Sequence, residues 1–174
     1  MFEARSIQEY KYRQSNKNLN RKETYLKEHI YVFFLRSEYN RSKYVVTIKE
    51  YANGLLTIDF YRKVSTSNKF RILSNEFKFG YLGATILDIM RDIQERSKVN
   101  TFGILASNLL SEDKNENNKR FRVYVEVLRR KVDGDKYQVL GSDTFSTIFV
   151  IPLERKKEEK EIIISYGNIF KETS

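Results

Sequence analysis

The sequence predicts an α/β (α+β) fold with a mixed, largely antiparallel sheet and two main helices. Two β-rich runs, "KYVVTIKEY" and "LLTIDFYRKV", flank a turn that contains Asn53-Gly54, which is typical of a β-hairpin. From Leu82 to Ile93, by contrast, the apolar residues recur at helical spacing. The 174 residues include one proline and seven glycines, fewer turn signals than sandwiches and propellers need, so long regular elements are favoured.

The remaining elements follow from local patterns of apolar residues. In chain order we expect a buried strand at 28–38, the hairpin, a strand at "KFRIL" (69–73), a helix from about 83 to 97, a buried strand at 99–107, and strands at "DTFSTIFVI" (143–151) and "EIIISY" (161–166). Alternating charges in "PLERKKEEKE" predict an exposed turn between the last two strands.

Residues 115 to 135, "NENNKRFRVYVEVLRRKVDGD", fit two different structures. As a helix, the segment opens on an asparagine cap and forms one apolar face, made of Phe121, Tyr124, Val125, Leu128 and Val132. As a strand, its valines alternate with polar residues, and Asp133-Gly134 supplies a hairpin turn. The helix is favoured because burial of that face outweighs the small loss of helix propensity at each valine. The hairpin remains the alternative.

Charge divides the chain into an arm and a domain. With 32 Lys and Arg residues against 23 Asp and Glu, the formal net charge is +9, which favours an anionic partner such as RNA, a ribonucleoprotein or an acidic protein. We expect residues 1–30 to form a basic, tyrosine-rich N-terminal arm or helix, and residues 31–174 to form a single α/β domain. Tyrosines beside cations can stack on bases while the cations contact phosphates.

Several kinds of site are disfavoured by the residues that the chain lacks. It has no cysteine, which excludes disulfides, thiolate metal sites and cysteine nucleophiles and is typical of a reducing compartment. The one histidine, His29, lies at the edge of an apolar run and the carboxylates are scattered singly, so we expect a structural histidine and no metal site. No apolar run suits a signal peptide or a membrane helix, and we expect a cytoplasmic protein.

The stretch "FKFGYLGAT", at 77–85, precedes the predicted helix. Backbone N–H groups and the positive end of the helix dipole meet at such a place, so Gly80 and Gly83 are candidates for an anion-binding turn. The same glycines equally suit a turn that packs the helix onto the sheet, and both interpretations stay open.

The order of hairpin strands, glycine-containing turn, helix, buried strand and second helix, over roughly residues 44 to 166, resembles the Gcn5-related N-acetyltransferase (GNAT) fold. In that family the turn binds the coenzyme A pyrophosphate, and the later helix carries Asn-x-x-Ala-x-x-Leu-Tyr, whose tyrosine reprotonates the departing thiolate. Asn117 and Tyr124 have this spacing, with Arg120 in the Ala position and Val123 in the Leu position. Leu82 stands where the turn requires Gly or Ala, so the resemblance implies a GNAT-like layout with a degenerate cofactor motif.

One candidate function implied by this resemblance is an acyl-CoA-dependent N-acetyltransferase. Acetyl-CoA would then be bound by Gly80, Gly83 and Asn117, with Tyr124 as the acid and Glu76 as the base that deprotonates the amine.

The favoured hypothesis is a non-catalytic binding protein without a cofactor. Residues 101–124 are similar to a recurrent pattern in small uncharacterised bacterial proteins, Phe-Gly-x-x-(Gly/Ala)-Ala/Ser, a polar loop, then Asn-x-Lys-Arg-Phe/Tyr-Arg-x-Tyr. A basic bacterial or phage protein of this size could engage RNA or a ribonucleoprotein, or inhibit a nucleic-acid-targeting defence complex as anti-CRISPR proteins do. An interaction domain for an acidic protein partner is the third possibility. The contacting residues would be Lys11, Arg13, Arg21, Lys22, Lys119, Arg120, Arg122, Arg129, Arg130 and Lys131.

Overall fold

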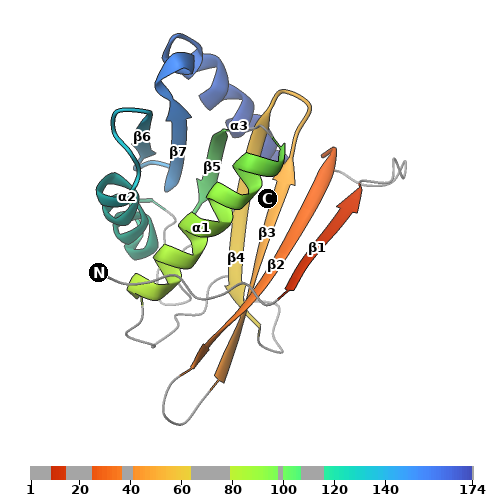
Figure 1. Cartoon of the computed structure of the whole chain (residues 1–174). Helices are drawn as coiled ribbons and strands as arrows, with labels where there is room; N and C mark the ends of the chain where they lie inside the picture. The colour runs from red at the N-terminus through yellow and green to blue at the C-terminus, as the bar shows by residue number, and fades with distance from the viewer. Residues whose placement is uncertain are drawn as a thin grey trace.

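A computed structural model of the chain describes residues 9–14, 25–36, 41–63, 79–97, 100–106 and 116–173 (Figure 1). These residues form seven strands in one sheet, in the order β1-β2-β3-β4-β5-β7-β6, and three α-helices. Every neighbouring pair of strands is antiparallel except β4 and β5, which are parallel. The prediction of an α/β (α+β) fold with a mixed, largely antiparallel sheet is therefore confirmed, with one α-helix more than expected.

The strands are β1 (Glu9–Gln14), β2 (Lys27–Arg36), β3 (Arg41–Glu50), β4 (Leu55–Arg62), β5 (Thr101–Leu105), β6 (Tyr137–Ser142) and β7 (Thr147–Pro152). The α-helices are α1 (Phe79–Ser97), α2 (Lys119–Lys131) and α3 (Glu159–Thr173), and a 3₁₀ helix, η2 (Leu153–Glu158), leads into α3. Among these described helices, none combines the length and the apolar character that crossing a membrane requires.

The predicted hairpin consists of β3 and β4. Gly54 closes its turn with a φ angle of 74°, a left-handed conformation that glycine adopts without strain. Side chains alternate along β4, so Leu56 and Ile58 point to one face of the sheet and Leu55 points to the other.

An apolar cluster covers each face of the sheet. Helices α1 and α2 lie on one face (Figure 1), where Ile89 and Leu128 belong to the same buried cluster as Leu56. Helix α3 covers the opposite face, where Ile162 and Tyr166 pack with Leu55, Phe149 and Ile151. Neighbouring positions of β4 therefore contribute to two separate cores.

Tyr166 of α3 joins β4 to β5 where their ladder begins. Its hydroxyl accepts a hydrogen bond from the N–H of Leu56 (3.2 Å) and lies within donating distance of two carbonyl oxygens, those of Leu56 (2.9 Å) and Thr101 (2.7 Å). A Cβ atom added at Gly103 would lie 2.4 Å from the Tyr166 ring. The ring therefore reaches the two strands only because β5 has a glycine at this position. We refer to this contact as the Tyr166 junction.

The C-terminal region differs from the prediction. A strand at 161–166 is wrong, because this segment belongs to α3, and the charged run before it forms η2 and the start of α3 in place of a turn. Ile162 and Tyr166 are four residues apart and both buried, as one face of a helix requires. Glu159 and Glu161 stabilise the first turn through the helix dipole. Together these effects outweigh the strand preference of three consecutive isoleucines.

Other elements depart from the prediction in smaller ways. Residues 9–14, assigned by sequence to an arm or helix, form β1 and pair with β2, which itself begins at Lys27. Strand β6 was not predicted, and the strand expected at 69–73 lies outside the described residues. Helix α1 begins at Phe79, so Gly80 and Gly83 lie inside the helix and the prediction of a turn at these glycines is wrong.

Replacing Gly103 with alanine should lower the free energy of unfolding by about 2–3 kcal/mol, because the new methyl group overlaps the Tyr166 ring. Gly167→Ala is the matched control: nothing lies within 4 Å of its added Cβ, and alanine in a helix interior should raise stability by about 0.5–1 kcal/mol. Urea unfolding measures both. A Gly103→Ala protein as stable as the parent would show that the ring does not need this space.

Candidate functional site

The parallel strands β4 and β5 separate at one end. Their register runs from Leu55↔Thr101 to Ile58↔Ile104, whereas β4 continues to Arg62 in register with β3. We refer to the space beyond the last β4–β5 pair as the fork; it is lined by Ile58, Asp59, Phe60, Ile104, Leu105, Arg120 and Tyr124. The two strands are thus joined at the Tyr166 junction and open at the fork.

The backbone of β4 directs hydrogen-bonding groups into the fork. Near its two ends, the Tyr51 N–H donates to the Leu55 carbonyl (2.9 Å) and the Lys63 N–H donates to the Lys43 carbonyl (2.8 Å), so odd-numbered positions are bonded to β3. Alternate residues of a strand turn their N–H and C=O groups to opposite neighbours. The N–H and C=O of Phe60 therefore point into the fork, where no described residue of β5 is in register with Phe60.

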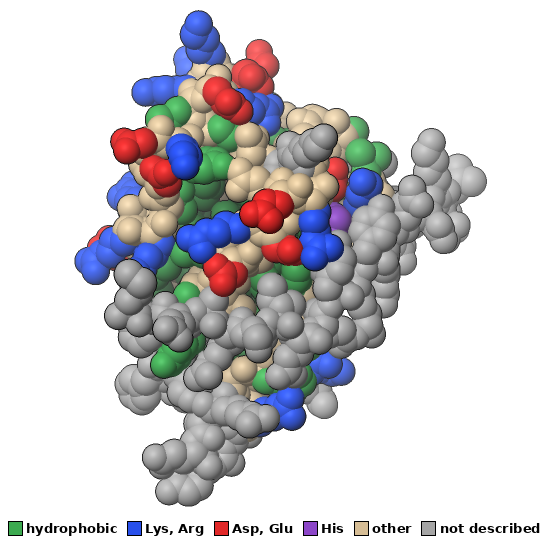
Figure 2. All heavy atoms as spheres, viewed as in Figure 1, with side chains coloured by type: hydrophobic (Ala, Val, Ile, Leu, Met, Phe, Trp, Pro, Cys, Tyr) green, Lys and Arg blue, Asp and Glu red, His purple; other side chains and the backbone are tan. Residues whose placement is uncertain are grey.

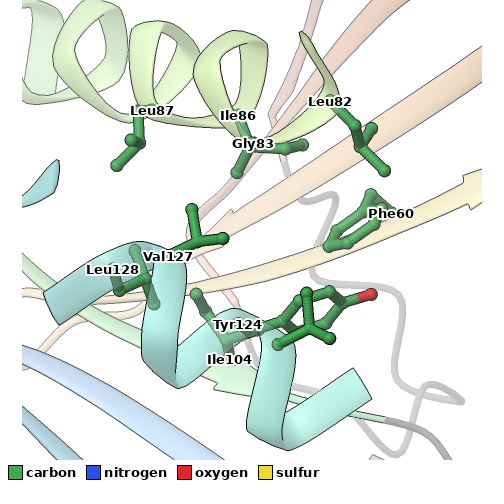
Figure 3. A pocket seen from close by; sticks show the side chains of 10 residues that line it. Phe60, Leu82, Gly83, Ile86, Leu87, Ile104, Tyr124, Val127 and Leu128 are labelled. Carbon is green, nitrogen blue, oxygen red and sulfur yellow. The ribbon is translucent and has the colours of Figure 1, made fainter. Parts of the chain in front are cut away.

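Two aromatic rings narrow the fork. The ring centroids of Phe60 and Tyr124 are 5.3 Å apart. The remaining space is a cavity of about 20 Å³ in the fork and one of about 40 Å³ in the adjoining apolar cleft between α1 and α2. Figure 3 shows this cleft, with Tyr124 and Val127 of α2 opposite Gly83 and its neighbours on α1. Each cavity has room for only a few water molecules, so the side chains themselves close the described part of the fork.

Asn118 determines where α2 begins. Its side chain accepts a hydrogen bond from the N–H of Phe121 (2.9 Å) and donates one to the carbonyl of Ala106 (2.5 Å), just after β5. Its N–H donates to the Ser146 hydroxyl (3.1 Å), just before β7. The start of α2 is thus tied to two strands, which brings Tyr124 over the fork.

The helical interpretation of residues 117–132 is confirmed, and the hairpin is wrong. Helix α2 buries Phe121, Val125 and Leu128 at the spacing of one helix face. The Val132 N–H donates to the Leu128 carbonyl (2.8 Å), and Val132 is the C-cap that follows the last helical residue, Lys131.

Tyr124 is a neutral hydrogen-bond donor. Burial raises the pKa of its phenol well above the ordinary value, and the guanidinium of Arg120, one turn earlier, lowers that pKa by less. The phenol therefore keeps its proton at physiological pH and can donate a hydrogen bond to a group in the fork.

The structure separates the other residues predicted for an acyltransferase. Gly80 lies in the first turn of α1, whereas Gly83 faces α2, since an added Cβ there would lie 3.1 Å from Val127 Cγ1. Asn117 is exposed beside the cap, and its N–H donates to the Asp143 carbonyl (2.8 Å). Glu76 lies outside the described residues.

The predicted cations do not form one surface. On α2, Lys119, Arg122, Arg129, Arg130 and Lys131 are exposed, whereas Arg120 lines the fork. Arg130 forms an ion pair with Glu126 (2.5 Å). Lys11 and Arg13 lie on β1, and Arg21 and Lys22 lie outside the described residues.

Sequence reasoning missed Asp59 and Phe60 as residues of the fork. It placed them correctly on opposite faces of a strand, but nothing local to β4 marks the point where its pairing with β5 ends. That point depends on a strand about 40 residues later in the chain.

Other titratable groups lie apart from the fork. His29 is buried, with its Nε2 atom 3.4 Å from Glu50 Oε2, and burial lowers its pKa although Glu50 opposes this shift. Within the described residues, no group of three or more His, Cys, Asp or Glu side chains could hold a metal ion.

Comparison with protein-family models, curated proteins and solved structures finds no match to this chain.

Alkaline conditions should destabilise the fold through Tyr124 and Tyr166. Burial raises the pKa of both phenols in the folded protein. Below about pH 10 both phenols are neutral in the folded and the unfolded chain, and their contribution to stability is fully present. Above about pH 10 they ionise in the unfolded chain first, so this contribution is lost as the pH rises. Each phenol contributes up to about 1.4 kcal/mol per pH unit. Absorbance titration counts the tyrosines that ionise only on unfolding, and Tyr124→Phe and Tyr166→Phe should each reduce that number by one. An unchanged number in either variant would show that the replaced tyrosine does not have a raised pKa in the folded protein.

Proposed function

We propose that the fork binds the pantetheine arm of an acyl-coenzyme A and that the protein is an acyltransferase of the GNAT type. The observation that carries this proposal is the end of the β4–β5 ladder beside Tyr124, where the N–H and C=O of Phe60 are directed into the fork. An extended ligand that contains amides can add to such an edge as a further strand. The pantetheine arm contains two amides and ends at the thioester, so it suits this edge.

The order of the elements also supports the proposal. Strands β3 and β4, helix α1, strand β5 and helix α2 follow one another in the order on which the GNAT resemblance rests. Gly80 lies at the start of α1 as described, and the N–H groups at the start of a helix can bind a pyrophosphate. Because Gly83 packs against α2 and Asn117 lies outside the cap, we assign the pyrophosphate to this first turn alone.

The proposed chemistry uses Tyr124 as the acid. The acceptor amine attacks the thioester carbonyl, the C–S bond breaks, and sulfur leaves with the electron pair as a thiolate. Tyr124 protonates the thiolate, and the amine loses a proton to a base, for which Glu76 is the candidate. That proton returns to Tyr124 through solvent, so the products are an amide and a thiol. The positive charge of Arg120 stabilises the developing thiolate.

Binding requires the fork to widen. Its cavities of about 20 and 40 Å³ are far smaller than the roughly 300 Å³ at which ligand pockets begin. The contact between the rings of Phe60 and Tyr124 narrows the fork, so separation of these rings is the step that admits the arm. Phe60 would thus control access.

Calorimetric titration with acetyl-CoA tests the acyltransferase proposal. We expect micromolar binding, and tighter binding by Phe60→Ala, because no ring then has to move. Tyr124→Phe should bind with unchanged affinity and lose about 10²–10⁴-fold in turnover, whereas Tyr137→Phe, outside the fork, should change neither.

Two outcomes would count against this function. Absence of heat and of a thermal shift with acetyl-CoA, in both the parent protein and Phe60→Ala, would remove the acyl-CoA site. Parallel loss of stability and turnover in Tyr124→Phe would make Tyr124 a core residue without a catalytic role.

The exposed cations of α2 favour a second candidate function, binding to RNA or a ribonucleoprotein. Six Lys or Arg residues and a single Glu occur in the 13 residues of this helix, and only Phe121, Val125 and Leu128 are buried. Cations concentrated in this way contact phosphates without reading base sequence. An inhibitor of a nucleic-acid-targeting complex, of the anti-CRISPR kind, would use such a surface, and so would a domain that binds an acidic protein.

Fluorescence anisotropy with a labelled single-stranded RNA tests the second function. Reversal of Arg129, Arg130 and Lys131 to Glu should weaken binding at least about tenfold and reduce its salt dependence. The matched control reverses Lys156, Lys157 and Lys160, which alternate with acidic residues and should matter little. Equal effects of the two triple variants would indicate net charge alone, and RNA-independent capture by an acidic protein would favour the third possibility.

A further inference from the structure

A second hollow lies between α1 and α2, where the two helices diverge over β5 and β7. Its volume is about 620 Å³, within the range of roughly 300–1,000 Å³ typical of small-molecule sites and much larger than the cavities at the fork. We refer to it as the α1–α2 hollow; it is lined by Leu87, Met90, Arg91, Gln94, Glu95, Phe102, Lys131, Val132, Asp133, Lys136, Tyr137 and Val150.

The floor of the α1–α2 hollow is apolar. Leu87 and Met90 come from α1, Phe102 from β5 and Val150 from β7, and all four are buried members of the main core cluster. Figure 2 shows hydrophobic side chains (green) in this recess, with charged side chains (blue and red) around them. A flat apolar group could lie on this floor without disturbing the core beneath it.

The rim of the α1–α2 hollow carries three cations, Arg91, Lys131 and Lys136, and two acids, Glu95 and Asp133. Arg91 is paired with Asp88 (2.7 Å), outside the hollow, and Lys136 is paired with Asp133 (3.3 Å) on an exposed part of the rim. Lys131 forms no ion pair with a described residue. The side of the hollow formed by the end of α2 and the start of β6 therefore attracts a negative charge.

Tyr137 adds a hydrogen-bond donor on the same side. Its hydroxyl accepts a hydrogen bond from Gln94 Nε2, across the hollow on α1. The phenolic hydrogen is therefore not used in that bond and can be donated to a ligand oxygen. Lys136 and Tyr137 both line the hollow, so this side offers a hydroxyl donor and a cationic side chain.

We propose that the α1–α2 hollow binds a small amphipathic anion, such as an aromatic carboxylate or sulfonate. Its ring lies on the Met90 and Phe102 floor, and its anionic group lies toward Lys131, Lys136 and the Tyr137 hydroxyl. The size of the recess suits a small molecule, and its charge suits an anion. The proposal is independent of the fork, because the hollow shares no residue with it.

Anilinonaphthalene sulfonate, whose fluorescence rises in apolar surroundings, is the probe for this site. We expect one molecule bound per chain, and affinity reduced about tenfold or more by Lys131→Glu combined with Lys136→Glu, both on exposed side chains. The uncharged analogue phenylnaphthylamine should bind the parent and this variant equally. A matched double reversal of Lys156 and Lys157, outside the hollow, should leave both probes unaffected.

Amide chemical shifts then locate the probe. Those of Met90, Gln94, Val132 and Tyr137 should change on titration, and those of Ile58 and Phe60 in the fork should not. The proposal is overturned if the sulfonate does not bind, if it binds at several sites, or if it binds the reversed variant as tightly as the parent. It is also overturned if the fluorescence of the sulfonate rises only as the protein melts.

Discussion

The hydroxyl group of Tyr166 connects two halves of the sheet. Strands β1 to β4 precede α1 in the chain, and β5, β7 and β6 follow it; in the described sheet the halves meet through a ladder of four residue pairs between β4 and β5. Tyr166 hydrogen-bonds backbone groups on both strands at the first two of these pairs. A buried backbone group without a partner is costly, so this short ladder depends on α3 being docked.

The fork follows from the same arrangement. Beyond Ile58, β4 stays paired with β3 as far as Arg62, while β5 stays paired with β7 up to Leu105↔Thr147. Each strand thus keeps its antiparallel neighbour, and among the described strands the sheet opens at the one parallel pair. Helices α1 and α2 wall the apolar cleft that adjoins the fork, and the α1–α2 hollow lies between them farther along, over the same sheet. In the described sheet the fork is therefore a consequence of one parallel pair placed between two antiparallel sets.

Local patterns predicted the elements that rest on local physics. The hairpin was predictable because Asn53-Gly54 suits its turn, and α2 because an asparagine cap precedes apolar residues at helical spacing. The segment at 161–166 was assigned to a strand because its isoleucines are β-branched, yet burial of Ile162 and Tyr166 against the sheet decides for a helix. That contact lies far away in the sequence, so no local pattern contains it.

The candidate site was predictable only in part for the same reason. Tyr124 was selected by its spacing from Asn117 and does line the fork, whereas Arg120 was assigned to a surface and lines the fork as well. Phe60 gains its significance from where β5 stops pairing with β4, which the sequence of β4 does not encode locally. The sequence predicted a turn at Gly83, whereas in the structure the missing side chain of Gly83 allows Val127 to pack closely against α1.

The distance along the chain between the partners of the Tyr166 junction bears on the order in which the protein folds. Tyr166 and Leu56 are 110 residues apart, so the meander of β2, β3 and β4 can form long before α3 arrives. Until then the edge of β4 that later meets β5 is uncovered, and uncovered strand edges pair with those of other chains. The rate at which α3 docks therefore sets how long this chain is exposed to aggregation during refolding.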